Sequence, residues 1–276
     1  MCRWLAYSGS PIKLDELLLK RDHSLIDQSL HSRMGATTTN GDGFGVGWYE
    51  EEEAPYLYRS THPAWNDRNL RELAAAVSSP LFFAHIRAST GSAIQETNTH
   101  PFRHGRWLWM HNGLIREFPL VRRELTQAVD DSLFTSIEGQ TDSELMFYLA
   151  LTFGLEDDPV DALERTVALI EETGRKHGVD DPIQMTVATT DGSSIWAFRY
   201  SSEHDSRSLY FSTRMDSLKS LYPELAELAA LSDETRVVVS EPLGDLPGAW
   251  HEVPESHVGI VQPGEDQLRP FTPRAS

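Results

Sequence analysis

The chain contains one cysteine, and this residue stands at position 2, directly after Met1. An initiator methionine is normally removed when the next residue is small, and removal here would leave a thiol and a free α-amine on the same residue. The reference pKa is ~8.5 for the thiol and ~7.7–8.0 for the amine, so moving the proton from sulfur to nitrogen costs only about 1 kcal/mol. The amine can then activate the thiol without a second residue. This pairing predicts an N-terminal nucleophile at Cys2, although a lone cysteine elsewhere is usually a small buried apolar residue.

A second candidate is the segment HIRAST, residues 85–90, which ends an apolar stretch. Residues 81–87 have the pattern of a buried strand, on which His85 and Arg87 point to the same face. An arginine in such a strand is costly to bury unless it is paired. Its partner could be an internal carboxylate, which is the commoner case, or the carboxylate of a ligand held by both arms of the guanidinium.

A third candidate is HNG, residues 111–113, at the end of the apolar segment 107–110. Asn-Gly by itself is a strong signal for a hairpin turn. The functional alternative is an oxyanion hole, in which the side-chain amide of Asn112 and the backbone N–H of Gly113 stabilise a developing negative oxygen. Loss of one such donor typically lowers the rate by about 10²–10³.

The fourth candidate, Asp142, stands at the start of a predicted helix over residues 143–153. An acid at this place complements the helix dipole. It could also receive the ammonium group of an amino-acid substrate, and the two roles are compatible. Arg87 and Asp142 together would supply the cation and the anion that a zwitterionic amino acid requires.

Bulk composition narrows the classes of partner. The net charge is −18, and a surface this acidic repels phosphate backbones and anionic lipids, so we expect neither nucleic acid nor membrane as a partner. No stretch is long enough to cross a bilayer and no secretory signal is evident, which predicts a cytoplasmic protein. One cysteine excludes internal disulfides and thiolate zinc sites, and the histidines lack metal-binding spacing, so we expect no metal and no cofactor. No GxSxG elbow is present, although a Ser-His-Asp triad stays open.

The pattern of elements predicts antiparallel sheets covered by helices. We expect strands at residues 2–7, 42–49, 81–87, 107–113, 183–189, 194–199, 209–212, 236–240, 250–253 and 257–262. We expect helices at 14–19, 66–77, 120–129, 143–153 and 159–172, the fourth opened by a capping box at 141–144. The glycines that alternate through 43–47 indicate a strand that another backbone or sheet approaches closely. These elements predict a single domain over residues 1–276, with its core at about 2–262 and a loose tail at 263–276.

Taken together, these segments resemble the class II glutamine amidotransferases, which belong to the N-terminal nucleophile hydrolases. The resemblance rests on the order and approximate spacing of Cys2, HIRAST (85–90), NTHPF (98–102), HNG (111–113) and TDSE (141–144). It implies an α+β fold, a four-layer αββα sandwich with two stacked, mainly antiparallel sheets between helical layers. It also implies that Cys2 is the nucleophile, that its amine is the base, and that Asn112 and Gly113 form the oxyanion hole.

The same resemblance assigns the residues that bind substrate. Arg87 and Thr90 would hold the α-carboxylate of a glutamyl group, Asp142 would hold its α-amine, and His111 would stand beside them. Two positions depart from the larger synthase members, which carry Trp and His where this chain has Ala88 and Gly91.

No synthase-like segment follows the glutaminase-like region, so the chain resembles the short stand-alone branch of the family. One member of that branch is a γ-glutamyl hydrolase of ergothioneine synthesis, and the opening MCRWLAYSG and the segment DGFGVGWY (42–49) are similar to it. The main hypothesis is an amidase that hydrolyses a small γ-glutamyl substrate through a Cys2 thioester. The alternatives are a glutaminase subunit that passes ammonia to a partner protein, and an inactive binding protein with the same fold. The sequence also leaves a homo-oligomer open.

Overall fold

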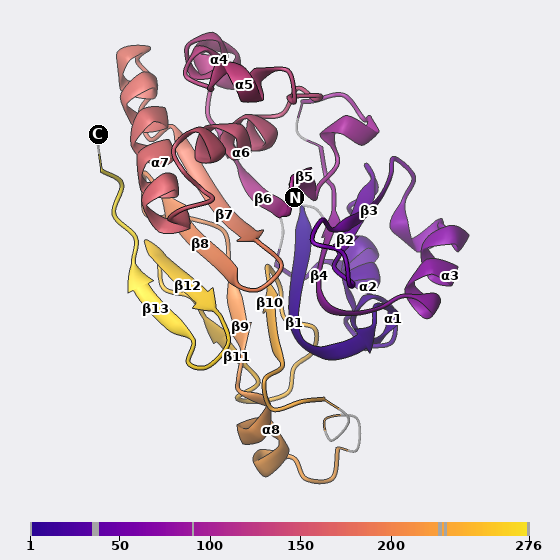
Figure 1. Cartoon of the computed structure of the whole chain (residues 1–276). Helices are drawn as coiled ribbons and strands as arrows, with labels where there is room; N and C mark the ends of the chain where they lie inside the picture. The colour runs from indigo at the N-terminus through magenta and orange to yellow at the C-terminus, as the bar shows by residue number, and fades with distance from the viewer. Residues whose placement is uncertain (1, 35–38, 90, 226–227, 229–230, 275–276) are drawn as a thin grey trace.

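A computed structural model (Figure 1) describes residues 2–34, 39–89, 91–225, 228 and 231–274. Two antiparallel sheets account for the strands found in these residues. Sheet A runs in the order β11 (Trp250–Glu252), β9 (Tyr210–Ser212), β10 (Arg236–Val239), β1 (Arg3–Lys13), β4 (Ser78–Ile86), β2 (Phe44–Trp48) and β3 (Tyr56–Ser60). Sheet B runs in the order β13 (Gln267–Pro270), β12 (His257–Val261), β8 (Ile195–Ser201), β7 (Ile183–Thr190), β6 (Trp107–Ile115) and β5 (Phe102–His104).

Helices cover the outer face of each sheet. Sheet A shares an apolar core with α1 (Asp15–Leu18), α2 (Leu25–His31) and α3 (Arg68–Ala76). Sheet B shares another with α4 (Phe118–Gln127), α6 (Asp142–Thr152) and α7 (Pro159–Lys176). Short segments lie in the connections, namely η1 (Ala64–Asn66), η2 (Glu96–Asn98), α5 (Asp131–Phe134) and α8 (Met215–Leu221). The result is the expected four-layer αββα sandwich of the α+β class.

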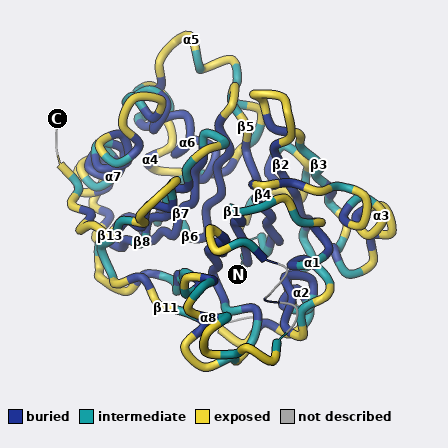
Figure 2. Tube along the Cα trace, turned by 60° about the horizontal axis from the view of Figure 1, so that its bottom comes forward, coloured by how far each residue is buried: buried dark blue, intermediate teal, exposed yellow. Residues whose placement is uncertain are grey.

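The inner faces of the two sheets pack against each other. Trp4 and Phe83 of sheet A form one buried cluster with Leu108, Met110 and Ala188 of sheet B. Figure 2 shows buried backbone running through both sheets, with the exposed residues concentrated on the outer helices and loops. Because strand side chains alternate, these contacts identify the residues of β1, β4 and β6 that face the layer between the sheets.

The glycines of β2 allow close approach, as their alternation predicted. A Cβ built on Gly47 would lie 2.8 Å from Cδ1 of Leu108 in the opposite sheet. A Cβ on Gly45 would overlap the carbonyl oxygen of His100. β2 therefore brings sheet B and the segment before β5 against sheet A more closely than any side chain would permit.

The tail differs from the expectation. We expected residues 263–276 to be loose, but β13 pairs with β12, and Phe271 is buried in the core beneath sheet B. The edge strands β3 and β5 and the short helices α2, α5 and α8 were also not expected. Their sequences are short and mixed in polarity, so the contacts that stabilise them come from distant residues.

Only one of the two hydrogen bonds of a capping box forms at residues 141–144. Oγ1 of Thr141 accepts the backbone N–H of Glu144 at 3.1 Å and so caps α6. The carboxylate of Glu144 does not return to Thr141. It accepts the backbone N–H groups of Glu138 and Gly139, at 2.9 and 2.7 Å, and thus fixes the loop before the helix.

None of the helices in the described residues combines the length and the apolar character needed to cross a bilayer.

Candidate active site

Cys2 lies at the start of β1, a strand in the interior of sheet A. Its partly exposed thiol contacts Ala88, which directly follows the adjacent strand β4. The backbone N–H of Ala88 donates to Sγ at 3.5 Å, and the carbonyl oxygen of Ala88 lies 3.6 Å from Sγ. Desolvation by the surrounding protein raises the pKa of the thiol, while the N–H of Ala88 acts in the opposite direction. A base beside this thiol would therefore be needed to form the thiolate.

Arg87 directly follows β4 and continues the alternation of Leu81 and Phe83, whose side chains point between the sheets. Only 3 % of the residue is exposed, and burial lowers the pKa of its guanidinium. Its Nη2 donates to Oγ of Ser92 at 2.7 Å, to the carbonyl of Ala93 at 3.1 Å and to Oγ of Ser89 at 3.3 Å. In the described part of the chain no carboxylate forms an ion pair with Arg87. The commoner alternative, an internal carboxylate partner, is thus not what these residues provide.

Two polar side chains hold the loop that follows Arg87. Oδ2 of Asp42 accepts the backbone N–H of Ser89 at 2.7 Å. The amide of Asn98 donates to the carbonyl of Ala93 at 2.9 Å and accepts the backbone N–H of Gln140 at 2.8 Å. These bonds fasten the loop to β2 and to the segment before α6, which brings sequence-distant parts of the site into one place.

Asn112 and Gly113 lie within β6, so they do not form the hairpin turn that Asn-Gly alone would favour. Asn112 follows Leu108 and Met110 on the face toward sheet A, and only 4 % of it is exposed. Its side-chain amide makes no hydrogen bond to another described residue. A Cβ on Gly113 would overlap the carbonyl oxygen of Gln184 on β7, so only glycine fits there.

A chain of contacts joins Asn112 to β1. Asn112 pairs with Thr186 of β7, whose Oγ1 lies 3.4 Å from the carbonyl oxygen of Asn112. The indole N–H of Trp4 donates to the same Oγ1 at 3.4 Å. Trp4 is two residues from Cys2 on the same face of β1. Figure 1 likewise shows β1 beside β6, with which it is in contact. Cys2 and Asn112 therefore approach the same end of the layer between the sheets.

Asp142 is the first residue of α6 and is partly exposed. Its Oδ2 accepts the backbone N–H of Ile115 at 2.8 Å, and its Oδ1 accepts that of Ser143 at 2.8 Å. The carboxylate thus links the end of β6 to the start of α6 while part of it stays accessible. The structural and functional roles considered for this residue are compatible.

Three buried histidines lie beneath the site. The rings of His85 and His100 are tilted by 32° with their centroids 4.2 Å apart, while Nδ1 of His111 shares a hydrogen bond of 2.7 Å with Oγ of Ser143. Burial lowers the pKa of His85 to about 3 and holds the pKa values of His100 and His111 below the usual value. All three are therefore neutral at physiological pH. In the described residues no set of three or more His, Cys, Asp or Glu side chains is arranged to hold a metal ion.

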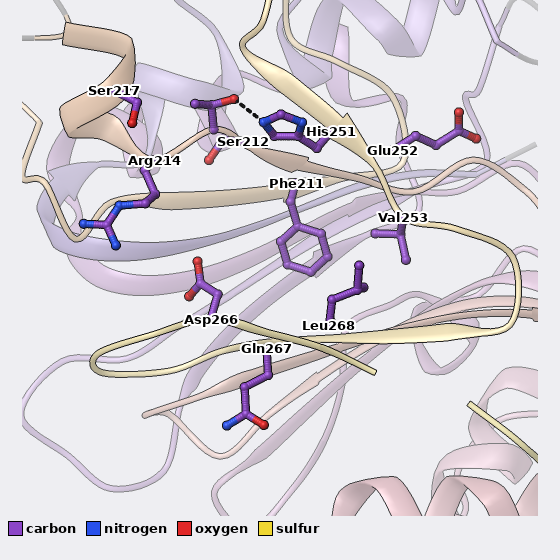
Figure 3. Close-up of a pocket in the computed structure, with 12 residues that line it drawn as sticks. Phe211, Ser212, Arg214, Ser217, His251, Glu252, Val253, Asp266, Gln267 and Leu268 are labelled. Atoms are coloured by element: carbon purple, nitrogen blue, oxygen red, sulfur yellow. Dashed lines mark hydrogen bonds between the residues drawn. The ribbon is translucent and has the colours of Figure 1, made fainter. Parts of the chain in front are cut away.

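A cavity of about 1070 Å³ opens beside these residues. It is lined by Gly113 and Asp142, by the loop 91–93 after Arg87, and by Arg116 and Arg122 farther out. A smaller cavity of about 400 Å³ lies at the other edge of the sandwich, between β9 and β11 on one side and β12 and β13 on the other (Figure 3). The larger cavity borders two of the candidate residues, Gly113 and Asp142, while Cys2, Arg87 and Asn112 are not part of its lining.

The structure thus brings Cys2, Arg87, Asn112, Gly113 and Asp142 to one end of the sandwich. His111 lies just below, with its Nε2 2.6 Å from the position that a Cβ of Gly113 would take. Thr90, the remaining expected residue, lies outside the described residues.

Sequence reasoning gave no role to Asp42, Asn98 or Ser143, which hold the site together. All three stand in segments quoted above, Asn98 in NTHPF, Asp42 at the start of DGFGVGWY and Ser143 in TDSE, but no local signal assigned a role to these side chains.

Comparison with known proteins places the chain among amidotransferases. A family model described as "Glutamine amidotransferases class-II" matches residues 19–274. The chain is 34 % identical to a probable glutamine amidotransferase, DUG3, of Saccharomyces cerevisiae, over 98 % of this chain and 84 % of that protein. It is 28 % identical to the γ-glutamyl-hercynylcysteine sulfoxide hydrolase of Mycolicibacterium smegmatis, over 98 % and 100 %. A solved glutamine aminotransferase class-II domain protein of Silicibacter pomeroyi is 33 % identical, with a TM-score of 0.76 over 99 % and 100 %.

The buried histidines predict a pH-dependent stability. Their pKa values are lowered on folding, whereas in the unfolded chain a histidine binds a proton below about pH 6.5. Unfolding therefore takes up protons as the pH falls below that value, and each such histidine reduces the free energy of unfolding by about 1.4 kcal/mol per pH unit. We expect stability to be nearly flat above pH 7 and to fall between pH 6.5 and 5, as measured by urea denaturation.

His100→Phe should reduce that slope by about 1.4 kcal/mol per pH unit, because one buried neutral imidazole is removed. His62→Gln is the matched control, since His62 is exposed and should leave the slope unchanged. An identical slope in the wild type and in His100→Phe would contradict the assignment.

Proposed function

Because the chain belongs to the class II glutamine amidotransferase family, we propose that it hydrolyses γ-glutamyl amides with Cys2 as the nucleophile. The observation that carries the proposal is the place of the only thiol. Cys2 directly precedes an interior strand and contacts Ala88, the neighbour of the buried Arg87, for which the described residues provide no carboxylate partner. A thiol beside such a guanidinium suits an amino-acid substrate with a reactive side-chain carbonyl.

Activation requires that Met1 be removed. With Met1 in place the nitrogen of Cys2 is a peptide amide, which cannot accept a proton. Once freed, the α-amine takes the proton of the thiol, and the resulting thiolate attacks the γ-carbonyl carbon of the substrate. The desolvated surroundings that raise the thiol pKa make this base necessary.

The carbonyl oxygen becomes negative as the carbon–sulfur bond forms. In the proposal the side-chain amide of Asn112 and the backbone N–H of Gly113 donate to it. The amide of Asn112 makes no hydrogen bond to another described residue, so it is available to donate to a substrate oxygen, which supports this role. His111 and Ser143 lie below Gly113 and would keep this end of β6 in position.

Collapse of the tetrahedral species breaks the carbon–nitrogen bond. The ammonium of Cys2 returns its proton to the departing nitrogen, and a γ-glutamyl thioester remains on Sγ. Water then attacks the thioester carbonyl while the amine of Cys2 accepts one of its protons. Protonation of the sulfur leaving group restores the thiol and releases glutamate.

The head group of the substrate fits the two charged residues beside the thiol. Arg87 would bind the α-carboxylate of the substrate, with Thr90 proposed beside it, and Asp142 would bind the α-ammonium. The accessible part of the Asp142 carboxylate and its place in the lining of the larger cavity support this assignment. With the α-carboxylate and the α-ammonium of the substrate both fixed, its γ-carbonyl would be held over Cys2.

The leaving group is proposed to be larger than ammonia. The cavity of about 1070 Å³ borders Gly113 and Asp142 and has room for a group larger than ammonia. The match to the whole length of the mycobacterial hydrolase also favours a γ-glutamyl conjugate cleaved by water.

The similarity to the yeast amidotransferase supports a second candidate, release of ammonia from glutamine to a partner protein. Comparison of kcat/KM for glutamine and for γ-glutamyl amines would separate the two. A clear preference for glutamine would favour the second candidate.

The acidic surface is consistent with small-molecule chemistry in the cytoplasm and offers little attraction for nucleic acid.

Replacement of Cys2 by alanine should abolish hydrolysis of γ-glutamyl substrates without unfolding the protein, because the nucleophile is lost and the residue lies at the end of its strand. The assay is glutamate release, with circular dichroism as the check on folding. Intact-mass measurement of the wild type should show a chain that begins at Cys2, and a glutamine-like diazo-ketone should label that residue alone.

Ser8→Ala is a suitable control, since Ser8 stands on the same strand but far from the thiol. Substantial activity in Cys2→Ala, or a folded wild type that hydrolyses no γ-glutamyl compound, would refute the proposed function. The second result would favour a binding protein.

Replacement of Arg87 by lysine or Asp142 by asparagine should chiefly raise KM. Neither residue touches the reacting carbonyl, so their contacts are similar in ground and transition states. Loss of one charge-assisted contact costs about 1.5–3 kcal/mol, which corresponds to a roughly ten- to 150-fold rise in KM. Steady-state kinetics and the melting temperature should be measured on the same samples.

The matched controls are Arg199→Lys and Asp158→Asn. Arg199 pairs with Glu252, and Asp158 caps α7, and neither lines the larger cavity. These controls should change Tm at most. If KM stays unchanged in both test variants while Tm falls, the two residues serve the fold alone and the substrate clamp is wrong.

A further inference from the structure

Glu241 follows the last strand residue of β10 and is almost completely buried, with 2 % of it exposed. Its Oε2 accepts Nε–H of Arg3 at 2.8 Å, which forms a buried ion pair across 238 residues of sequence. The same carboxylate accepts the backbone N–H groups of Arg33 and Met34 at 2.9 and 3.1 Å. One acidic side chain therefore connects the first strand to the segment that follows α2.

Arg3 extends this contact to the candidate nucleophile. Its Nη1 donates to the carbonyl oxygen of Cys2 at 2.9 Å, while its Nη2 donates to Oγ of Ser32. Ser32 in turn donates to Oε2 of Glu241 at 3.2 Å. The guanidinium thus donates from Nε to the carboxylate of Glu241 and from Nη1 to the backbone carbonyl of Cys2. The single ammonium group of lysine could not make both contacts in this geometry.

Further contacts hold Glu241 itself. His23 lies on its far side, with Nε2 2.6 Å from Oε1, and Gln28 donates to the carbonyls of Glu241 and Pro242 at 3.2 and 3.3 Å. Burial by itself would raise the pKa of Glu241, but the N–H groups of Arg33 and Met34, together with His23 and Arg3, outweigh it and hold the pKa below its usual value. The acid is therefore ionised and fixed from several sides.

A nucleophile at a chain end has a particular need for such contacts. The first residues of a chain are poorly ordered unless something ties them down. A displacement of about 1 Å at a reacting group can lower the rate by about 10²-fold. The backbone N–H of Trp4 is already held by Oγ of Ser240 at 3.0 Å. The carbonyl of Cys2 lies nearer the chain end than Trp4, and Nη1 of Arg3 donates to it.

We propose that Arg3 and Glu241 are positioning residues for Cys2. The ion pair fixes the guanidinium, the guanidinium fixes the carbonyl of Cys2, and the thiol and α-amine are thereby held toward the oxyanion donors and the substrate. This inference rests on the proposed function in assigning a catalytic purpose to the contact. The contact itself makes a prediction about the thiol whether or not the protein is a hydrolase.

A stabilising role alone is a weaker explanation. Replacing a buried ion pair by apolar residues of the same size is often neutral or stabilising, so such a pair is not retained for stability as such. An apolar pair would lack the N–H directed at Cys2. A second buried arginine, Arg236, pairs with Asp266 and donates to the carbonyls of Asp233 and Thr235, far from the thiol. It supplies a matched control within the same sheet.

The test compares Arg3→Lys and Glu241→Gln with Arg236→Lys in the full-length protein, well below each variant's melting temperature. Cys2 is the only thiol, so iodoacetamide reports on it alone. We expect Arg3→Lys and Glu241→Gln to be alkylated several-fold faster than the wild type, because a released residue moves its thiol away from Ala88 into water. In the same variants kcat for a γ-glutamyl substrate should fall about 10²-fold, with KM unchanged. A faster thiol reaction combined with slower catalysis is not expected from a loss of stability.

Arg236→Lys should lower Tm and leave both the alkylation rate and kcat at wild-type values. If Arg3→Lys and Glu241→Gln behave as Arg236→Lys does, the pair is purely structural and the inference is wrong. Intact mass must show the same N-terminal residue in every variant. Should the wild type hydrolyse no γ-glutamyl substrate, the proposed function fails, yet the alkylation rates still decide whether Arg3 and Glu241 hold Cys2.

Discussion

The pairing of β1 with β4 on one side and β10 on the other is the constraint on which the rest of the structure depends. It pairs the chain on both sides from its first residues, with Arg3 already opposite Ile86, so that Cys2 directly precedes an interior strand. Trp4 and Ala6, on the inner face of β1, contribute to the packing between the sheets and so give the strand a rigid support. Cys2 directly precedes this strand, against Ala88, which follows Arg87 on the neighbouring chain segment.

Both neighbours of β1 bring a charged residue to this end. β4 is followed by the segment that contains Arg87 and Ala88, and β10 by Glu241. A short chain terminus could not by itself define the direction of a thiol. In sheet A, strands that begin or end at the same level surround the terminus and so fix its direction. Asn112 of sheet B approaches from the opposite side.

The residues with a local signal could be predicted from the sequence. Arg87 was found because a charge interrupts an apolar strand, Asp142 because it begins a helix, and Cys2 because of its position. The same strand argument applies to Arg3, which precedes the apolar residues of β1, and it would have indicated a buried partner. The identity of that partner, Glu241, was beyond reach, since 238 residues separate the two and only the antiparallel pairing of β1 with β10 joins them.

The limits of the fold prediction have a similar cause. The interior strands carry enough apolar residues to be recognised, and so do the helices that cover sheet B. The edge strands β3, β5 and β13 are short and carry exposed polar residues, so their formation depends on a neighbour already in place. The tail was expected to be loose because it is rich in proline and charge, whereas the buried ring of Phe271 ties it to the core.

The buried histidines illustrate a cost that only the structure reveals. Neither ring nitrogen of His85 or His100 has a hydrogen-bond partner among the described residues. Buried polar atoms normally have hydrogen-bond partners, so packing alone does not explain why these two imidazoles lie beneath the site. Because these rings are neutral, they add no positive charge beside Arg87.

The central claim is that a γ-glutamyl group is carried on the sulfur of Cys2 during turnover. The most direct measurement is to mix the enzyme with a γ-glutamyl substrate, quench in acid within one turnover, digest, and locate the adduct by mass spectrometry. We expect a γ-glutamyl thioester on a peptide that begins at Cys2, and its disappearance at longer times. An adduct on any other residue, or turnover by a chain that still carries Met1, would contradict it.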